Sequence, residues 1–252
     1  MPRPSIDMGL VNVMRHGVRL LARVHETRLE GQEHLPPGGA LLVGNHGLLG
    51  YETLLFFEQI LSSTGRLPRG LADRWFYKVP GLGRVLDRIG AVIGSPEQGH
   101  RLLDAGHLVV CYPGGAREVL KHHASSRYRL RWERSAGFVR LALRAGVPIV
   151  PFAAAGVDDA YSIIRRLEGT GVRLMGDDKY DLPLLRGALG PLPKRVPFWF
   201  RIGAPIELER GDVEGDAMEA VVARLHRQVW DHTQTMLDEL VEEWRRSIAC
   251  AS

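Results

Sequence analysis

Little in this sequence points to a disulfide framework or to a membrane-spanning segment. It holds two cysteines, Cys111 inside an apolar run and Cys250 near the C-terminal end. A secreted disulfide scaffold needs more cysteines than this, so we expect a reducing, cytoplasmic setting. No apolar run reaches the roughly 18 to 20 residues of a membrane-spanning helix, and arginines interrupt the region where a signal peptide would be apolar. The sequence predicts a protein that is soluble or lies on a membrane without crossing it.

Several signatures of binding and catalysis are also missing. No Gly-Lys-Ser/Thr follows a glycine-rich turn, as a nucleotide P-loop requires, and no Gly-x-Ser-x-Gly elbow of the α/β-hydrolases occurs. The histidines lack the spacing of zinc-binding helices, so no metal site is predicted. No long block of Lys and Arg indicates a nucleic-acid partner. The formal net charge of +4 suits anionic ligands or a lipid surface.

Strand patterns alternate with helical patterns along most of the chain. Helical periodicity separates the strands and predicts a long helix over 215–248, whereas 157–197, rich in Gly, Pro, Asp and Arg, predicts loops and short helices over the site. We therefore predict one α/β domain with a mostly parallel sheet flanked by helices. The strands are expected, from their apolar runs, at 40–44, 91–93, 108–112, 147–152 and 198–202. The prolines of the strand at 147–152 suggest an edge or an end.

The range 8–25 predicts an amphipathic helix. Its apolar side chains share a broad face, and Arg15, Arg19 and Arg23 recur every fourth residue on the opposite side. A helix of this kind can lie in a lipid headgroup layer with its apolar face down. It can equally dock on its own domain and leave the arginines in water. The pattern does not decide between the two.

The first polar motif stands where the strand at 40–44 ends. Asn45 and His46 follow the apolar run, and Glu52 comes six positions after the histidine, where a helical pattern begins. An imidazole held by a carboxylate takes a proton from a hydroxyl at neutral pH. The alternative is that His46 caps the turn and Glu52 merely favours the positive helix N-terminus. Because a histidine near an acid is common, the motif alone favours this structural interpretation.

The second motif continues from the strand at 108–112 and reads Tyr112-Pro113-Gly114-Gly115-Ala116-Arg117-Glu118. Adjacent glycines let the backbone approach a ligand closely and expose amide donors. The planar guanidinium of Arg117 suits a phosphate or a carboxylate. An ordinary turn, with a surface ion pair between Arg117 and Glu118 or its neighbours, explains the same residues.

With both motifs in this order, the chain resembles the lysophospholipid acyltransferase-like superfamily, the glycerolipid acyltransferases, from about residue 40 to residue 208. That family pairs a His with an Asp across four intervening residues, whereas here that position is Tyr51 and the acid is Glu52. In the second motif, Gly114 and Ala116 stand where lysophosphatidate-forming members carry Glu and Thr. Both departures resemble the branch of diacylglycerol acyltransferase-like enzymes and plant phytyl ester synthases. The strand at 147–152 and the turn at 203–206 are similar to the family's later motifs.

The resemblance implies an O-acyltransferase that moves a fatty acyl group from acyl-CoA or acyl carrier protein to a lipid hydroxyl, with no bound cofactor. It assigns His46 as general base and Glu52 as its partner. The backbone amides of Gly114 and Gly115 are candidates for stabilising an oxyanion or binding a phosphate. The remaining predicted substrate-binding residues are Asn45, Tyr112, Arg117 and Glu118.

The resemblance also suggests an organisation and a location. We expect an N-terminal amphipathic helix over 1–30, a catalytic domain over 31–210 and a C-terminal helical extension over 211–252 packed on the same domain. Partners would be acyl-CoA, a lipid acceptor and the inner face of a membrane as a peripheral contact. A thioesterase or lipid esterase with the same His–acid pair, and a non-catalytic acyl-lipid-binding protein, remain alternatives. The acceptor, the acyl chain length and the oligomeric state stay open.

Overall fold

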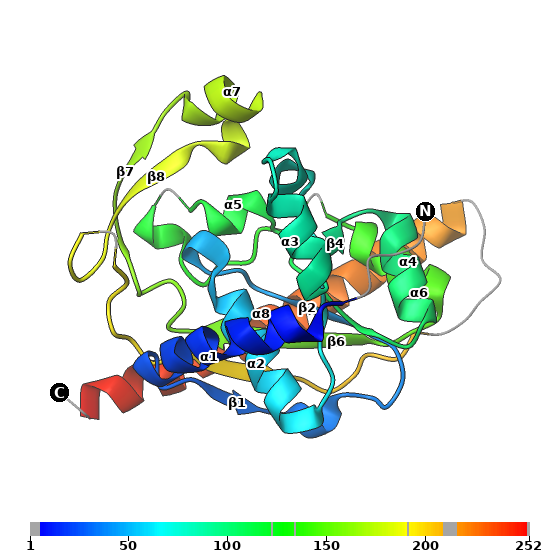
Figure 1. Cartoon of the computed structure of the whole chain (residues 1–252). Coiled ribbons are helices and arrows are strands. Elements are labelled where there is room, and N and C mark those ends of the chain that lie inside the picture. The colour runs from blue at the N-terminus through cyan, green and yellow to red at the C-terminus, as the bar shows by residue number, and fades with distance from the viewer. Residues whose placement is uncertain (1–5, 122, 134, 191, 209–215, 251–252) are drawn as a thin grey trace.

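A central sheet organises the protein, and helices cover both of its faces (Figure 1). The computed structural model describes residues 6–121, 123–133, 135–190, 192–208 and 216–250. The sheet contains β1 (Arg28–Glu30), β2 (Ala40–Gly44), β3 (Arg69–Ala72), β4 (Val92–Ile93), β5 (Leu108–Cys111), β6 (Ile149–Ala155) and β9 (Trp199–Ile202). Their order is β1-β9-β6-β2-β5-β3-β4, and every neighbouring pair is parallel except β6 and β9. The predicted α/β class with a mostly parallel sheet is confirmed.

Helices connect the strands and form the two outer layers. The α-helices are α1 (Met8–Val24), α2 (Glu52–Thr64), α3 (Leu82–Ile89), α4 (Pro96–Asp104), α5 (Ala116–Val119), α6 (Gly137–Ala145), α7 (Thr170–Met175) and α8 (Asp216–Cys250). Short 3₁₀ turns are η1 (Gln32–His34), η2 (Leu48–Gly50), η3 (Arg74–Lys78), η4 (Ala124–Ser126) and η5 (Asp178–Tyr180). Figure 1 shows α1 and α2 in front of the sheet and α8 behind it. Of the segments predicted at the two ends, residues 1–5, 211–215 and 251–252 lie outside the described residues.

The middle strand β2 accounts for the unbroken apolar run at 40–44. All five of its residues are buried, and it pairs with β5 on one side and β6 on the other. A strand covered on both faces must be apolar at consecutive positions. A side chain on Gly44 would lie 2.5 Å from the Phe152 carbonyl oxygen, so only glycine fits where β2 ends. The strand therefore delivers the next residues, Asn45 and His46, to the carboxyl edge of the sheet.

β6 is an internal strand, so the edge or end position predicted from its prolines is wrong. Pro151 has no N–H to donate, but its carbonyl accepts the Gly203 N–H at 2.8 Å. Because the N–H and C=O of one residue point to the same side of a strand, the missing donor faces β9 and not β2. The regular ladder with β9 begins one residue later, at Phe152 opposite Ile202. Proline is tolerated at such an irregular point.

Helix α1 confirms the helix predicted over 8–25, but its sides are arranged differently from the prediction. Arg15 and Arg19 donate to the Glu58 carboxylate on α2, at 2.8 and 2.6 Å, so these arginines contact the body of the protein. Val13 and Leu20 are 72% and 63% exposed. The helix therefore docks along one edge of its apolar face and leaves the other edge uncovered.

Residues 162–186 form an arm that stands off the sheet at one corner of the molecule (Figure 1). Within it, β7 (Ser162–Leu167) and β8 (Leu182–Arg186) pair antiparallel, and α7 and η5 lie between them. The prediction of loops and short helices for 157–197 missed this hairpin. Its strands are short and half exposed, and a bulge between Ile163 and Arg165 breaks their alternation. Such strands lack a continuous apolar run. We call residues 162–186 the β7–β8 arm.

Candidate active site

His46 and Glu52 lie side by side at the carboxyl edge of the sheet. The chain leaves β2, turns through η2 and enters α2 at Glu52. His46 Nδ1 lies 2.5 Å from Glu52 Oε1, and the same oxygen accepts the Gly47 N–H at 2.9 Å. The structure thus brings together the two residues that the first motif predicts as a pair.

The turn between them depends on left-handed backbone. Leu49 and Gly50 have φ values of 66° and 72°, a region that strains every residue except glycine. A side chain on Gly50 would also lie 2.9 Å from His46 Cε1. Glycine at position 50 therefore both allows the turn and leaves space for the imidazole ring.

The surroundings of Glu52 fix the proton on the imidazole. Burial alone would raise the pKa of Glu52, but the His46 charge, the hydrogen bond from His46 and the Gly47 N–H together hold it below its ordinary value. An ionised carboxylate only accepts, so the hydrogen bond at His46 Nδ1 requires a proton there. In the neutral imidazole the lone pair is therefore on Nε2, which has no hydrogen-bond partner among the described residues. The His46 side chain is 15% exposed and lines the cavity described below.

Tyr112 holds the imidazole from one side. The two rings stack with centroids 3.8 Å apart and planes 12° apart. The Tyr112 hydroxyl accepts a hydrogen bond from Thr53 Oγ1 at 3.1 Å, and burial raises the pKa of Tyr112 well above its ordinary value. A neutral, fixed phenol ring therefore limits rotation of His46.

The double-glycine turn lies next to this pair, but its amides are not equivalent. The Gly115 N–H donates to the Tyr112 carbonyl at 3.0 Å, so it is used within the turn. Ala116, the next residue, lines the cavity, and its N–H has no acceptor in the described part of the chain. A side chain on Gly114 would lie 2.2 Å from Glu118 Cδ. Gly114 does not line the cavity, so a role for its amide stays a prediction, and the Ala116 amide is added as a candidate.

The side chains of Asn45 and Glu118 make hydrogen bonds to backbone groups and do not line the cavity. Asn45 exchanges two hydrogen bonds with the Ala154 backbone, at 2.8 and 3.0 Å. Glu118 is fully buried and accepts the backbone N–H of His46 and that of Arg131, each at 2.8 Å. Burial raises the pKa of Glu118, and the Lys121 charge opposes that rise. We revise the predicted role of both residues from substrate binding to positioning.

Lys121 and Asp158 belong to the same support, and sequence reasoning missed both. Lys121 Nζ donates to the His46 carbonyl at 2.5 Å and to Asp158 Oδ1 at 2.9 Å, and both side chains are buried. Asp158 also accepts the Leu48 N–H at 3.2 Å. Nothing in the sequence distinguishes Lys121 from a surface lysine, because its partners lie 75 and 37 positions away.

Arg117 is exposed beside the double-glycine turn. Within the described residues its guanidinium makes no hydrogen bond or ion pair, and Glu118 is turned away into the core. The predicted alternative of a surface ion pair between these neighbours is therefore wrong. The guanidinium is left available to an anion from outside.

A cavity of about 630 Å³ opens beside His46. Its walls come from α1, α2, β3, η3, α3, α5 and the β7–β8 arm, and most of the lining is apolar. The charged lining residues apart from His46 are Arg15, Glu58 and Asp73. Arg15 and Glu58 pair with each other, and Asp73 accepts hydrogen bonds from the Trp75 N–H and the Tyr180 hydroxyl. The space suits a long apolar group.

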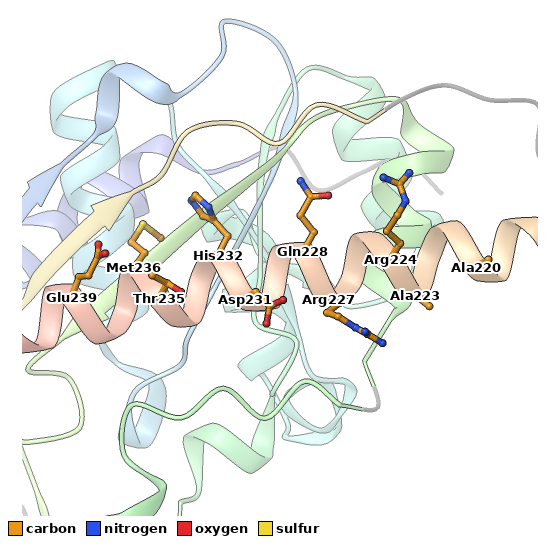
Figure 2. Close-up of a pocket in the computed structure, with 10 residues that line it drawn as sticks. All are labelled: Ala220, Ala223, Arg224, Arg227, Gln228, Asp231, His232, Thr235, Met236 and Glu239. Carbon is orange, nitrogen blue, oxygen red and sulfur yellow. The ribbon is translucent and has the colours of Figure 1, made fainter.

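A larger concave surface, of about 940 Å³, lies along α8, on the other side of the sheet (Figure 2). Arg224, Gln228 and His232 project from one side of the helix there, while Arg227 and Asp231 project from the other (Figure 2). None of the predicted site residues lines this surface. The smaller cavity is therefore the candidate active site.

Two further classes of site are absent from the part of the chain that the structure describes. No group of three or more His, Cys, Asp and Glu side chains is placed to bind a metal ion. No helix there has the length and hydrophobicity needed to cross a membrane.

Comparison with known proteins decides the family. The model of a family described as "Diacylglycerol acyltransferase" matches residues 77–249. The chain belongs to the diacylglycerol acyltransferase family. This confirms the resemblance to the glycerolipid acyltransferases and to their diacylglycerol acyltransferase-like branch. The matched range contains the motif at 112–118 and begins after His46 and Glu52.

Curated relatives of this diacylglycerol acyltransferase family member include proteins of animals, plants and mycobacteria. The chain is 33% identical over 228 residues to the mouse protein named "DGAT1/2-independent enzyme synthesizing storage lipids", covering 87% of this chain and 66% of that protein. It is 35% identical over 133 residues to "Phytyl ester synthase 1, chloroplastic" of Arabidopsis thaliana, covering 50% of this chain and 19% of that one. The chain thus spans less than two thirds of the length of these relatives.

Among solved structures, the 1-acyl-sn-glycerophosphate acyltransferase PlsC of Thermotoga maritima superposes with a TM-score of 0.46. The sequence identity is 14%, and the superposition covers 85% of this chain and 79% of that chain.

Proposed function

We propose that this protein is an O-acyltransferase that transfers a fatty acyl group from a thioester, acyl-CoA or acyl carrier protein, to the hydroxyl of an uncharged lipid. The observation that carries the proposal is the His46–Glu52 pair at the wall of a largely apolar cavity. Family membership supports acyl transfer as the reaction class. A purely binding protein would not need a buried carboxylate that fixes the tautomer of a histidine inside its cavity.

The geometry suits general-base catalysis. His46 Nε2 removes the proton of the acceptor hydroxyl while the oxygen attacks the thioester carbonyl carbon. Glu52 stabilises the imidazolium that forms, because its carboxylate already lies 2.5 Å from Nδ1. The amide of Gly114 or Ala116 stabilises the oxyanion. Collapse of the tetrahedral intermediate breaks the carbon–sulfur bond, and the leaving thiolate takes the proton from Nε2, which gives an ester and a free thiol.

The charges around the cavity favour an uncharged acceptor. Apart from His46, the basic residue among those that line the cavity is Arg15, and Glu58 already neutralises its charge. A phosphate headgroup inside this space would be buried without a counter-ion, which is costly. A diacylglycerol, a monoacylglycerol or a long-chain alcohol carries no such charge. This favours them over a lysophospholipid.

The charged part of the donor would stay outside the cavity, where Arg117 is exposed. Replacing Arg117 with lysine keeps the charge and removes the bidentate fork. We expect KM for acyl-CoA to rise about tenfold, because the free energy of one charge-assisted hydrogen bond corresponds to about that factor in affinity, and kcat should change little. Initial rates at varied acyl-CoA measure this. Arg224→Lys, on α8, is the matched control and should behave as the wild type, and the same kinetics for Arg117→Lys would remove Arg117 from donor binding.

Access to lipid acceptors would come from a peripheral contact of α1 with the cytoplasmic face of a membrane. Val13 and Leu20 are exposed on the edge of α1 that does not touch the body, while Val11, Met14 and Val18 of the same helix line the cavity. An amphipathic helix with an uncovered apolar edge binds at the level of the headgroups. The helix would then place the cavity close to its lipid substrates.

The decisive experiment is incubation with labelled acyl-CoA and a panel of lipid alcohols, followed by identification of the labelled product. The proposal expects acylated neutral lipid and free CoA in equal amounts. Labelled free fatty acid as the main product would identify a thioesterase or esterase instead. Binding of acyl-CoA without turnover on any acceptor would identify a lipid-binding protein.

A further inference from the structure

The solvent-exposed surface of the β7–β8 arm, called its outward side below, carries large apolar side chains. Ile164, Val172, Leu174 and Leu184 are between 38% and 65% exposed. They lie on three elements of the arm: β7, α7 and β8. Ile164 is exposed because it occupies the bulge of β7, between the paired residues Ile163 and Arg165. Single exposed apolar side chains are common in folded proteins, whereas four on one small arm indicate a contact surface.

Arginines alternate with these apolar side chains. Arg165 follows Ile164 and pairs across the hairpin with Leu184, and Arg173 stands between Val172 and Leu174. Both guanidinium groups are exposed. The ion pairs that the structure shows on the arm are Arg166 with Asp181 and Lys179 with Asp177. Within the described residues, neither Arg165 nor Arg173 has an acidic partner, so their charges are available to anions outside the protein.

The inward side of the same arm belongs to the cavity. Met175 ends α7, Tyr180 ends η5 and Leu182 begins β8, and all three line the space next to His46. The Tyr180 hydroxyl donates to Asp73 Oδ2 at 2.9 Å, which ties the arm to the opposite wall beside η3. A ligand held by the arm's outward side would therefore lie within a few side chains of the cavity.

We propose that the outward side of the β7–β8 arm is a second lipid-contact surface, which binds anionic headgroups through Arg165 and Arg173 and inserts Ile164, Val172, Leu174 and Leu184 among the lipids. It acts together with α1, so that lipid touches the protein on two walls of the cavity. The inference rests on the proposed function, because it names the surface from which that site takes its acceptor.

The composition of the arm favours a lipid surface over another protein chain. The buried centre of a protein interface is depleted of charge, whereas unpaired arginines alternate here with the apolar side chains. Basic residues adjacent to inserted apolar ones are the arrangement that binds anionic bilayers. A second copy of this chain would have to cover the unpaired Arg165 and Arg173 together with the apolar side chains.

The test is co-sedimentation with vesicles of phosphatidylcholine, with and without phosphatidylglycerol, in the absence of acyl donor. For Val172→Ser/Leu174→Ser we expect a fall of at least about tenfold in the partition coefficient on both vesicle types. For Arg165→Gln/Arg173→Gln we expect a fall of about tenfold that is confined to the vesicles containing phosphatidylglycerol and disappears at high salt. These side chains are exposed, so thermal unfolding should not change.

Two controls separate the arm from general effects. Val172→Ile/Leu174→Met keeps the apolar surface and should bind as the wild type does. Arg224→Gln/Arg227→Gln removes the same charge from α8 and should bind as the wild type does. Unchanged partitioning of both arm variants, with binding lost only in a Val13→Ser/Leu20→Ser variant of α1, would overturn the proposal.

Other outcomes are equally clear. A dimer that the arm variants abolish, together with unchanged vesicle binding, would show that a second copy covers this surface. Absence of vesicle binding by the wild type would also overturn the inference, while the proposed acyl transfer could still be measured with detergent-dispersed substrates. Conversely, the arm substitutions could weaken vesicle binding while the wild type shows no acyl transfer. This result would support the inference and refute the proposed reaction.

Discussion

Replacing His46 with alanine should lower kcat by about 10²- to 10⁴-fold, the usual contribution of a positioned general base. In the proposed mechanism the imidazole takes the proton of the acceptor hydroxyl, and the Glu52 carboxylate lies 2.5 Å from its Nδ1. The measurement is the initial rate of ester formation with acyl-CoA and the acceptor identified in the product panel. Binding of the acceptor should change little, because the removed nitrogen acts mainly in the transition state.

The same substitution leaves Glu52 buried without its main partner, so folding must be checked separately. Glu52 Oε2 already lacks a hydrogen bond within the described residues. His46→Gln offers an N–H donor to this carboxylate but no base, and it should be as inactive as the alanine variant while unfolding closer to the wild-type temperature. Near-normal turnover by a folded variant of either kind would rule out His46 as the base.

Replacing Lys121 with methionine should lower the free energy of unfolding by about 3–5 kcal/mol, the cost of removing one partner of a buried ion pair. Asp158 would keep its backbone donors but lose the charge that neutralises it. The turn at His46 would also lose its tie from Lys121 Nζ to the His46 carbonyl. Denaturant unfolding measures the effect, and the midpoint should fall without a change in slope.

Lys179→Met is the matched control, because Lys179 forms an ion pair with Asp177 at the surface. An exposed pair of this kind contributes at most about 1 kcal/mol. If Lys121→Met unfolds at the same denaturant concentration as the control, the buried pair does not support the site. In the fraction that stays folded, we expect kcat to fall more than the affinity for acyl-CoA, since the lysine positions the base and does not touch the donor.

The sequence predicts those features that local pattern determines. β2 and β5 are covered on both faces, so their apolar runs are unbroken, and the end of the first run locates His46 at the end of a strand. The pairing of His46 with Glu52 involves residues only six positions apart on one turn. Local chemistry of this kind can be recognised in the sequence.

The features that the sequence does not predict depend on contacts between distant segments. Glu118 holds the His46 amide across 72 positions, and Arg15 reaches Glu58 across 43. From sequence alone, Glu118 has the pattern of a ligand-binding residue. Arg15 has the pattern of a residue on a solvent-exposed helix face. Pro151 misleads for the same reason, because its position depends on where β9 begins to pair. Burial of charge within a network cannot be inferred from any short stretch.

The left-handed turn at Leu49 and Gly50 affects how related proteins can be found by their sequence motifs. It accommodates one residue more between base and acid than the family's usual spacing does, and the longer glutamate side chain still reaches the ring. An aspartate at position 52 would fall short of Nδ1 by about the length of one carbon–carbon bond. Loop length and acid identity thus have to change together, and a search keyed to a fixed His-to-Asp interval would overlook proteins built in this way.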